Sequence, residues 1–142
     1  MRRSANGSRS CKAGDAIEFI SVEYDDPRVQ ALRDAYYQTW GQKPFADPRA
    51  EWIGAFHGAD LVGALGIIRF PQNHEVDITD LLVVEGRWGA VAAYELLNWI
   101  NDHVAPGTRV IGTVVATNVR MMRALHAYGA KPVTVVFLKE YE

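Results

Sequence analysis

The sequence predicts a single α/β (α+β) domain, in which helices cover both faces of a mixed, mostly antiparallel sheet of six to seven strands. Strand-like and helix-like segments follow one another in the order β-α-β-β-β-α-β-α-β, which is typical of this class. Residues 52–70 hold two apolar runs around the short link 57–60 (HGAD), and this pattern predicts a β-hairpin. Residues 75–84 (EVDITDLLVV) become continuously apolar in their second half, which indicates a strand covered on both faces.

The first strand and the first helix follow from local patterns. Residues 17–22 (IEFISV) alternate apolar and polar side chains, as a strand does. Asp26 is favoured as an N-cap and Pro27 as the first helical residue, so a helix is expected to begin here. Apolar side chains then recur at spacings of three and four as far as Trp40, and Gly41 is expected to end the helix.

The remaining elements are predicted in the same way. Apolar residues from Ala93 to Val104 recur with helical spacing and predict a helix after the strand at 75–84. The last three elements are a strand at 109–116, a helix from its N-cap Asn118 to Gly129, and a strand at 133–139.

Composition limits the classes of function. The chain has 142 residues, enough for one domain with its own core. A formal net charge of −2 gives no general reason to bind nucleic acid or an anionic membrane, and no apolar run reaches the roughly 18 residues of a membrane span. Cys11 is the only cysteine, so no intrachain disulfide can form, and this fits a reducing compartment such as the cytoplasm.

Residues 1–15 differ from the rest and predict a flexible basic tail ahead of a domain at 16–142. The segment is polar, contains Gly and Ser, and carries cations such as Arg2, Arg3 and Lys12. A disordered tail is one interpretation, and a short basic arm that touches an acidic partner is the other. A secretory signal is excluded because no apolar segment follows the arginines.

Three segments, taken with the order of elements, resemble the GNAT superfamily of acyl-CoA-dependent N-acetyltransferases over residues 17–140. The second and third strands of that family are matched by AFHGADLVGALGI. Its fourth strand, acyl-CoA loop and following helix are matched by DLLVVEGRWGAVAAYELL, and its fifth strand and next helix by VVATNVRMMRALHAYGAKPV. The resemblance implies acetyl-CoA as cosubstrate and an amine acceptor, either a small molecule or a protein. The tail-plus-domain layout also resembles GNAT-like proteins of tailed bacteriophages, some of which travel in the virion.

The acyl-CoA loop of the family reads Arg or Gln, two residues, Gly, one residue, then Gly or Ala. Its backbone N–H groups bind the pyrophosphate of coenzyme A at a helix N-terminus. Arg87 and Ala92 fit this pattern, but Ala90 stands where the first glycine is expected. The alternative interpretation is a turn whose small residues allow close packing of helix on sheet. The matching cofactor-binding residues are Arg87, Trp88, Gly89, Ala90, Val91 and Ala92.

The resemblance also implies that pantetheine lies between the fourth and fifth strands. Its amide groups would pair with the exposed backbone of the fourth strand, as an added strand would, and by position this involves Leu82 and Val84. Asn118 would lie near the pantetheine arm, and its interpretation as a plain N-cap is compatible with that place.

Transfer of an acetyl group to an amine requires a general base. Alternation places Asp80 on the same strand face as Val76, Ile78 and Leu82, so a raised pKa is expected for its carboxyl group. A structural carboxylate with a partner is the alternative for this residue.

The family's general acid is a tyrosine, at a position that Leu125 occupies in this sequence. An acid is therefore absent, replaced by water, or supplied by Tyr128 or His126.

Two functions from different classes remain open. The first is an acetyl-CoA-dependent N-acetyltransferase; the second is a catalytically degenerate GNAT-like binding or structural protein, for example a virion-associated or host-interacting phage protein. A nucleic-acid factor using the basic tail is a third hypothesis, against which the net charge argues. No metal site is expected because the four histidines are scattered. A homodimer through the last strand is compatible with the pattern.

Overall fold

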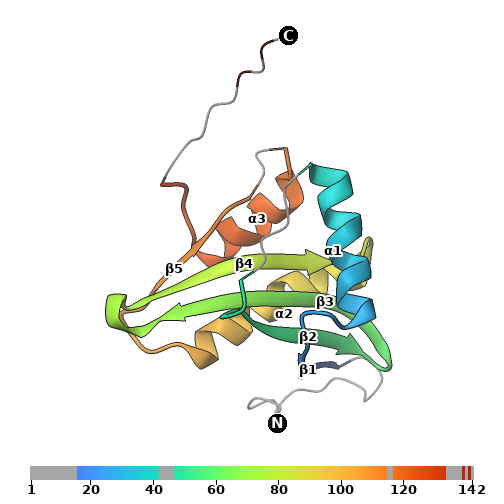
Figure 1. Cartoon of the computed structure of the whole chain (residues 1–142), viewed down its shortest axis with the longest axis horizontal. Coiled ribbons are helices and arrows are strands. Elements are labelled where there is room, and N and C mark those ends of the chain that lie inside the picture. Colours follow the sequence, from blue (N-terminus) through green and yellow to red (C-terminus); the bar gives the residue numbers. More distant parts are fainter. Residues whose placement is uncertain (1–15, 42–46, 115–116, 134–138, 140, 142) are drawn as a thin grey trace.

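The computed structural model describes residues 16–41, 47–114, 117–133, 139 and 141. The elements alternate as the sequence predicts for this part of the chain (Figure 1). They are β1 (Ile17–Val22), α1 (Pro27–Trp40), β2 (Glu51–His57), β3 (Asp60–Phe70), a 3₁₀ turn (Pro71–Asn73), β4 (Glu75–Val83), α2 (Arg87–His103), β5 (Arg109–Gly112) and α3 (Val119–Tyr128).

One mixed sheet forms the centre of the fold. Its strands lie in the order β1-β2-β3-β4-β5. The first four pair antiparallel in succession, and β5 pairs parallel to β4 after the crossover through α2. The β2–β3 hairpin and the apolar strand β4 confirm two of the sequence-based predictions.

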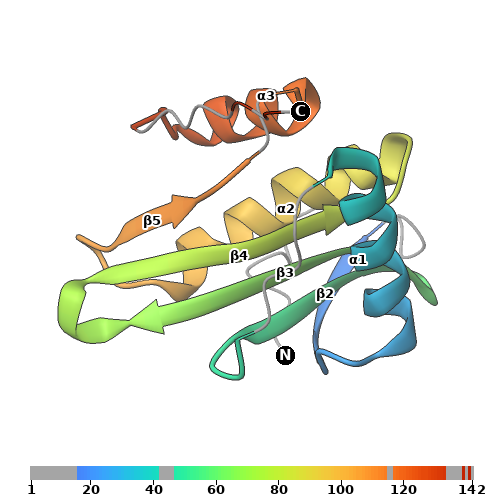
Figure 2. The same ribbon diagram turned by 45° about the horizontal axis from the view of Figure 1, so that its top comes forward.

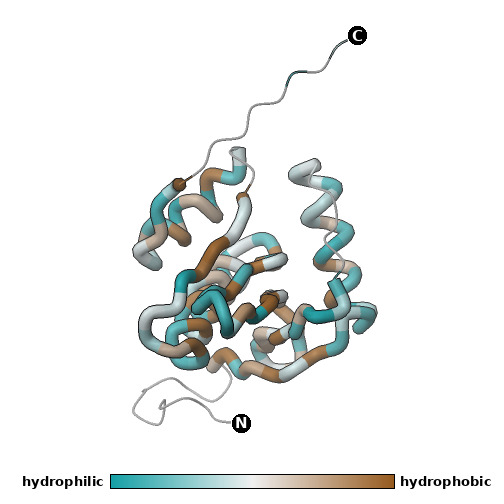
Figure 3. Tube along the Cα trace, turned by 60° about the vertical axis from the view of Figure 1, so that its left-hand side comes forward, coloured by the Kyte–Doolittle hydropathy of each residue, from teal (hydrophilic) through white to brown (hydrophobic). Residues whose placement is uncertain are grey.

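Helices cover both faces of the sheet, as expected (Figure 2). The larger core cluster joins one sheet face to α2 and α3, through residues such as Leu65, Leu96 and Ile100 that have no exposed surface. A smaller cluster, around Val29 and Trp52, joins the other face to α1. In Figure 3, α1 is coloured mostly from hydrophilic to neutral, which agrees with its smaller share of the core.

The predicted helix caps are confirmed. The Asp26 side chain accepts a hydrogen bond from the Arg28 N–H, and Gly41 ends α1 in the left-handed region at φ 68°. The Asn118 side chain accepts from the Met121 N–H at the start of α3. These boundaries depend on neighbouring residues alone, which is why the sequence predicts them well.

The strand content differs from the prediction. The described residues form a sheet of five strands instead of six to seven. The fifth strand, expected at 109–116, ends at Gly112 because the chain beyond it no longer pairs with β4. The strand expected at 133–139 and the tail at 1–15 lie outside the described residues, apart from positions 133 and 139. Among the described helices, none combines the length and apolar character that crossing a membrane requires.

Candidate active site

The strands β4 and β5 pair only along the first part of β4. Ile78 with Gly112 is the last pair, yet β4 continues to Val83. Figure 2 shows β5 running beside β4 and the chain then turning away toward α3. Within the described residues, the edge of β4 at 79–83 therefore has no strand partner on the β5 side.

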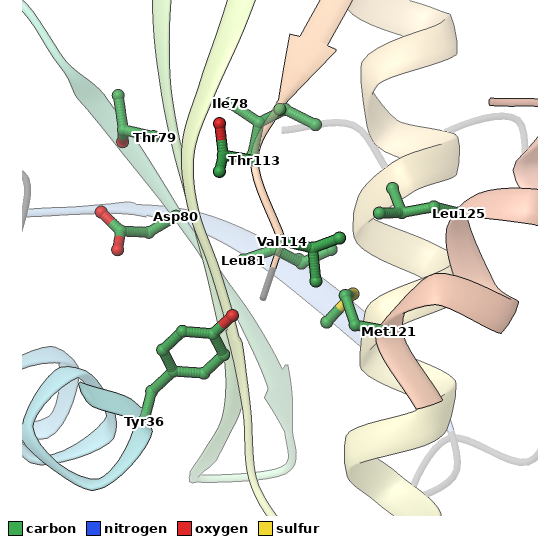
Figure 4. A pocket seen from close by; sticks show the side chains of 10 residues that line it. Tyr36, Ile78, Thr79, Asp80, Leu81, Thr113, Val114, Met121 and Leu125 are labelled. Atoms are coloured by element: carbon green, nitrogen blue, oxygen red, sulfur yellow. The ribbon is translucent and has the colours of Figure 1, made fainter. Parts of the chain in front are cut away.

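Two cavities follow this divergence. The first cavity lies between β4 and the chain after β5, where Asp80, Leu81, Thr113 and Val114 line it together with Tyr36 of α1 (Figure 4). The second cavity, of about 100 Å³, continues to the start of α2. Residues that line it include Tyr36, Val84, Gly89, Ala90, Asn118 and Arg120.

The N-terminus of α2 opens on the second cavity without a side-chain cap. Gly86 precedes the helix at φ 91°, a left-handed conformation that glycine adopts readily, and no side chain caps the helix there. The N–H of Ala90 bonds the Gly86 carbonyl oxygen at 3.2 Å, which leaves the first-turn amides ahead of it without an intrahelical acceptor. Such an uncapped helix start attracts an anion.

The small residues of this loop serve two different purposes. A Cβ atom on Gly89 would lie 1.7 Å from the Val84 carbonyl oxygen, so glycine allows the close packing of α2 on β4. Ala92 is fully buried, and its side chain faces Gly63 of β3. Ala90 instead lines the second cavity. Close packing thus explains Gly89 and Ala92, whereas Ala90 borders the second cavity.

Arg87, Trp88 and Val91 are arranged around the same helix start. The Trp88 ring stacks on the His57 ring, with centroids 3.8 Å apart, and packs against the larger core cluster. The Arg87 guanidinium lies 5.0 Å from the centre of the Trp88 ring. Val91 packs against the core. Of these three, only Arg87 is exposed and charged, and so suited to contact an anion at the helix start.

A β-bulge interrupts β4. Gly66 of β3 pairs with Asp80, and the next residue, Ile67, pairs with Ile78, so Thr79 is an extra residue in β4. A bulge of this kind changes which face of the sheet the following side chains point to.

The bulge corrects the predicted face of Asp80. Val76 and Ile78 belong to the cluster under α2, whereas Leu82 packs in the cluster under α1. Figure 4 shows Thr79 and Asp80 on one side of β4 and Ile78 on the other. The prediction that Asp80 shares a face with Val76 and Ile78 is therefore wrong, because simple alternation ignores the extra residue.

Asp80 is a buried carboxylate beside the first cavity. It is 6% exposed, and its Oδ1 accepts a hydrogen bond from the Tyr37 hydroxyl group of α1. Burial raises the pKa of Asp80 to about 6, although the Tyr37 hydrogen bond and the Arg33 charge oppose this shift. Arg33 is itself buried, and its guanidinium lies 3.9 Å from the centre of the Tyr24 ring. A carboxylate with this pKa is ionised at neutral pH and can accept a proton.

The two tyrosines considered as proton donors occupy different places. Tyr128 packs against the core at the end of α3 and lines neither cavity. Tyr36 lines both cavities, and its pKa is raised by burial and lowered in part by a hydrogen bond with Asn118. The helical pattern identifies Tyr36 only as a packing residue, because nothing local in the sequence shows its proximity to Asn118.

The backbone of β4 offers hydrogen-bonding groups to the gap at alternate residues. The Val84 N–H donates to the Val62 carbonyl oxygen of β3 at 3.0 Å. The expectation that Val84 offers its amide to a ligand does not fit this hydrogen bond. Because alternate residues of a strand point to opposite neighbours, Leu82 also faces β3, whereas Leu81 and Val83 face the gap.

Comparison with known proteins gives the fold but not the family. No protein-family model matches the chain. No curated protein matches it either. Solved structures do resemble it: a possible acetyltransferase from Clostridium difficile 630 has 13% identity and a TM-score of 0.64, over 89% of this chain and 97% of that one.

Two other similar structures have named activities. Ribosomal-protein-alanine N-acetyltransferase from Brucella melitensis biovar Abortus 2308 has 14% identity and a TM-score of 0.61, over 89% of this chain and 100% of that one. An aminoglycoside acetyltransferase from an uncultured soil metagenomic sample, in complex with sisomicin, has 13% identity and a TM-score of 0.57, over 89% of this chain and 97% of that one. The described chain therefore has the fold of the GNAT acetyltransferases.

Proposed function

We propose that this protein is an acyl-CoA-dependent N-acetyltransferase that transfers an acetyl group from acetyl-CoA to an amine. The divergence of β4 and β5 carries the proposal, because two cavities lie along it, one lined by Asp80 and the other by the uncapped start of α2. A thioester substrate with an anionic end fits such a path: phosphates bind at the helix start, and a pantetheine arm binds along the strand.

The proposed binding residues follow from this path. The first-turn amides of α2 and the Arg87 guanidinium bind the pyrophosphate. The backbone groups of Leu81 and Val83 pair with the pantetheine amides in place of Leu82 and Val84. Asn118 borders the same cavity while it caps α3. Acetyl-CoA supplies the activated acetyl group when it is bound.

Asp80 is the proposed general base. Its Oδ1 is held by the Tyr37 hydroxyl group, which leaves Oδ2 without a partner in the described residues. The Asp80 carboxylate accepts a proton from the amine nitrogen as this nitrogen forms its bond to the acetyl carbon. The bond between that carbon and the thioester sulfur of acetyl-CoA breaks in the same transfer.

Tyr36 is the proposed proton donor to the departing sulfur. Its raised pKa keeps the hydroxyl group protonated at neutral pH, and the residue borders both cavities. The proposal does not assign this role to Tyr128 or His126, because neither residue lines the first or the second cavity. The proposal includes a cytoplasmic location, which fits the single cysteine.

A catalytically degenerate GNAT-like binding protein is the second candidate, including a virion-associated or host-interacting phage protein. Two observations favour it: the Ala90 side chain lines the second cavity, and Leu125 lines the first where the family has its tyrosine. Both residues differ from those of the family's catalytic pattern, but neither closes a cavity.

Two measurements separate these candidates. Acetyl-CoA at millimolar concentration should raise the melting temperature by about 8–16 °C if it binds with micromolar affinity. Release of coenzyme A thiol in the presence of a panel of amines then measures transfer. A thermal shift without any acceptor-dependent thiol release favours the binding protein, and no thermal shift at all contradicts the enzyme.

A further inference from the structure

The α1 face of β4 carries two carboxylate oxygens that no donor satisfies in the described residues. They are Oδ2 of Asp80 and Oδ1 of Asp77, both shielded from solvent. Asp80 is 6% exposed as a residue and lines the first cavity (Figure 4). The Thr79 hydroxyl group on the same face is shielded and, in the described part of the chain, without a partner as well. A buried acceptor without a donor costs free energy, and a ligand that supplies donors to these two oxygens would remove this cost.

Asp77 lies on the same face as Asp80. Its neighbours Val76 and Ile78 pack on the α2 side, and alternation therefore turns Asp77 toward the α1 side. The bulge at Thr79 brings Asp80 to that side as well, so the two carboxyl-bearing residues follow one another along one face of β4.

The three acidic residues on this face of β4 differ in whether a cation lies beside them. Glu75, next to Asp77 on the same face, forms an ion pair with Arg109 at 3.0 Å. Within the described residues, neither Asp77 nor Asp80 forms an ion pair. Burial first, then a side-chain hydrogen bond with Glu75 and the Glu75 charge, raise the pKa of Asp77 to about 6, although the Arg109 charge opposes this shift. At neutral pH, Asp77 therefore carries a charge that its surroundings disfavour. A cation beside Asp77 would remove this cost.

We propose that the acceptor is a dicationic amine, of which one nitrogen is acetylated beside Asp80 while a second ammonium group binds Asp77. The inference rests on the proposed function and names its substrate class. Strand residues rise about 3.3 Å each, so the two carboxylates lie about 7–10 Å apart. Linear diamines such as diaminobutane, diaminopentane and diaminohexane reach across a gap of this order.

The test compares each diamine with the monoamine of the same carbon number. With the full-length protein and acetyl-CoA, kcat/KM for diaminopentane should exceed that for pentylamine by about tenfold or more, because a shielded ion pair adds to binding. Asp77→Asn should reduce this ratio toward one. Asp102→Asn, an exposed change of equal charge on α2, is the matched control and should leave the ratio unaltered. Equal values for diamine and monoamine in the unaltered protein would overturn the inference.

A binding measurement separates this inference from the proposed function. Calorimetric titration with diaminopentane alone should give heat that Asp77→Asn abolishes and Asp102→Asn retains, whether or not transfer occurs. Absence of diamine binding, or binding that Asp77→Asn leaves intact, contradicts the dicationic acceptor. Titration of the same preparation with acetyl-CoA tests the acetyltransferase itself, so either proposal can fail alone. Circular dichroism confirms that each variant is folded.

Discussion

The two faces of β4 serve different purposes although they belong to one strand. On the α2 face, Ile78 and Leu81 pack into the larger core cluster and fix the strand in place. On the α1 face, Asp77 and Asp80 are shielded carboxylates with incompletely satisfied oxygens. The bulge at Thr79 separates the two sets, because it turns Asp80 away from the core that alternation would have assigned to it.

This contrast shows how a small domain combines stability with a reactive group. The core face accounts for the packing of α2 and α3, whereas the α1 face holds charges that cost stability and are useful for chemistry. Changes to the Asp80 carboxylate on the α1 face should therefore lower activity while preserving or raising stability, and changes on the α2 face should lower stability.

The largest effect is expected from Asp80→Asn, because this change removes the proposed base. The kcat/KM for an accepted amine should fall by about 10²–10⁴-fold. In the unaltered protein, kcat/KM should decline as the pH falls below about 6, where Asp80 becomes protonated. Steady-state thiol release across pH measures both effects. A variant that keeps full activity would assign Asp80 a structural role.

The same variant should become more stable at neutral pH. The pKa of Asp80 is about 6 in the folded protein, against 3.8 for an aspartate that is fully exposed to water, so protonation favours the fold. The contribution of protonated Asp80 to the free energy of unfolding is fully present below pH 3.8. This contribution is lost as the pH rises through about 6. Asp80→Asn removes the cost of ionisation, and its free energy of unfolding should exceed that of the unaltered protein by about 3 kcal/mol at pH 7. Denaturant titrations should show this difference disappearing in acid.

Gly89→Ala probes the opposite face, where α2 packs on β4. The added Cβ atom would approach the Val84 carbonyl oxygen to 1.7 Å, so the start of the helix must move. We expect a loss of about 2–4 kcal/mol in the free energy of unfolding, together with weaker acetyl-CoA binding. Gly112→Ala is the control, because its Cβ atom would lie 3.4 Å from the nearest atom, an ordinary contact. Equal stability of the two variants would contradict the close packing.

Tyr36→Phe should lower kcat by about tenfold, because the hydroxyl group beside both cavities is the proposed proton donor. Tyr128→Phe removes the same atom from a residue that lines neither cavity and should leave kcat unchanged. Single-turnover measurements on the pair distinguish the two positions. A larger loss of kcat in Tyr128→Phe than in Tyr36→Phe would assign the proton-donor role to Tyr128.

Ala90→Gly should have the smallest effect. Removing the methyl group that lines the second cavity gives a bound phosphate more room, and acetyl-CoA should bind about three- to tenfold more tightly. Calorimetry measures the change. A glycine variant that binds acetyl-CoA more weakly would show that the methyl group supports the ligand.

The sequence predicts those parts of the fold that depend on neighbouring residues. The caps at Asp26 and Asn118 and the apolar run of β4 are confirmed for this reason. The predicted fifth strand is too long, because the apolar run continues past Gly112 whereas pairing with β4 stops there. Strand length depends on the partner strand, which the local pattern does not contain.

The candidate site shows the same limit. The residue type of Asp80 and its raised pKa could be predicted, but the face it occupies could not. The bulge arises from the register of β4 against Gly66 and Ile67 of β3, a relation between distant segments. The sequence does not reveal Tyr36 as a site residue, because its position on α1 is also a packing position and only the folded chain brings it to both cavities.

The binding of acetyl-CoA between β4 and β5 is tested most directly by amide resonances during a titration with this ligand. The largest chemical-shift changes should fall on the amides of Arg87 and Trp88 at the start of α2 and of Leu81 and Val83 on the open edge of β4. Amides of β1, at the far edge of the sheet, should change little. Saturation with acetyl-CoA that leaves the α2 and β4 amides unmoved, or no binding at millimolar ligand, would contradict the account.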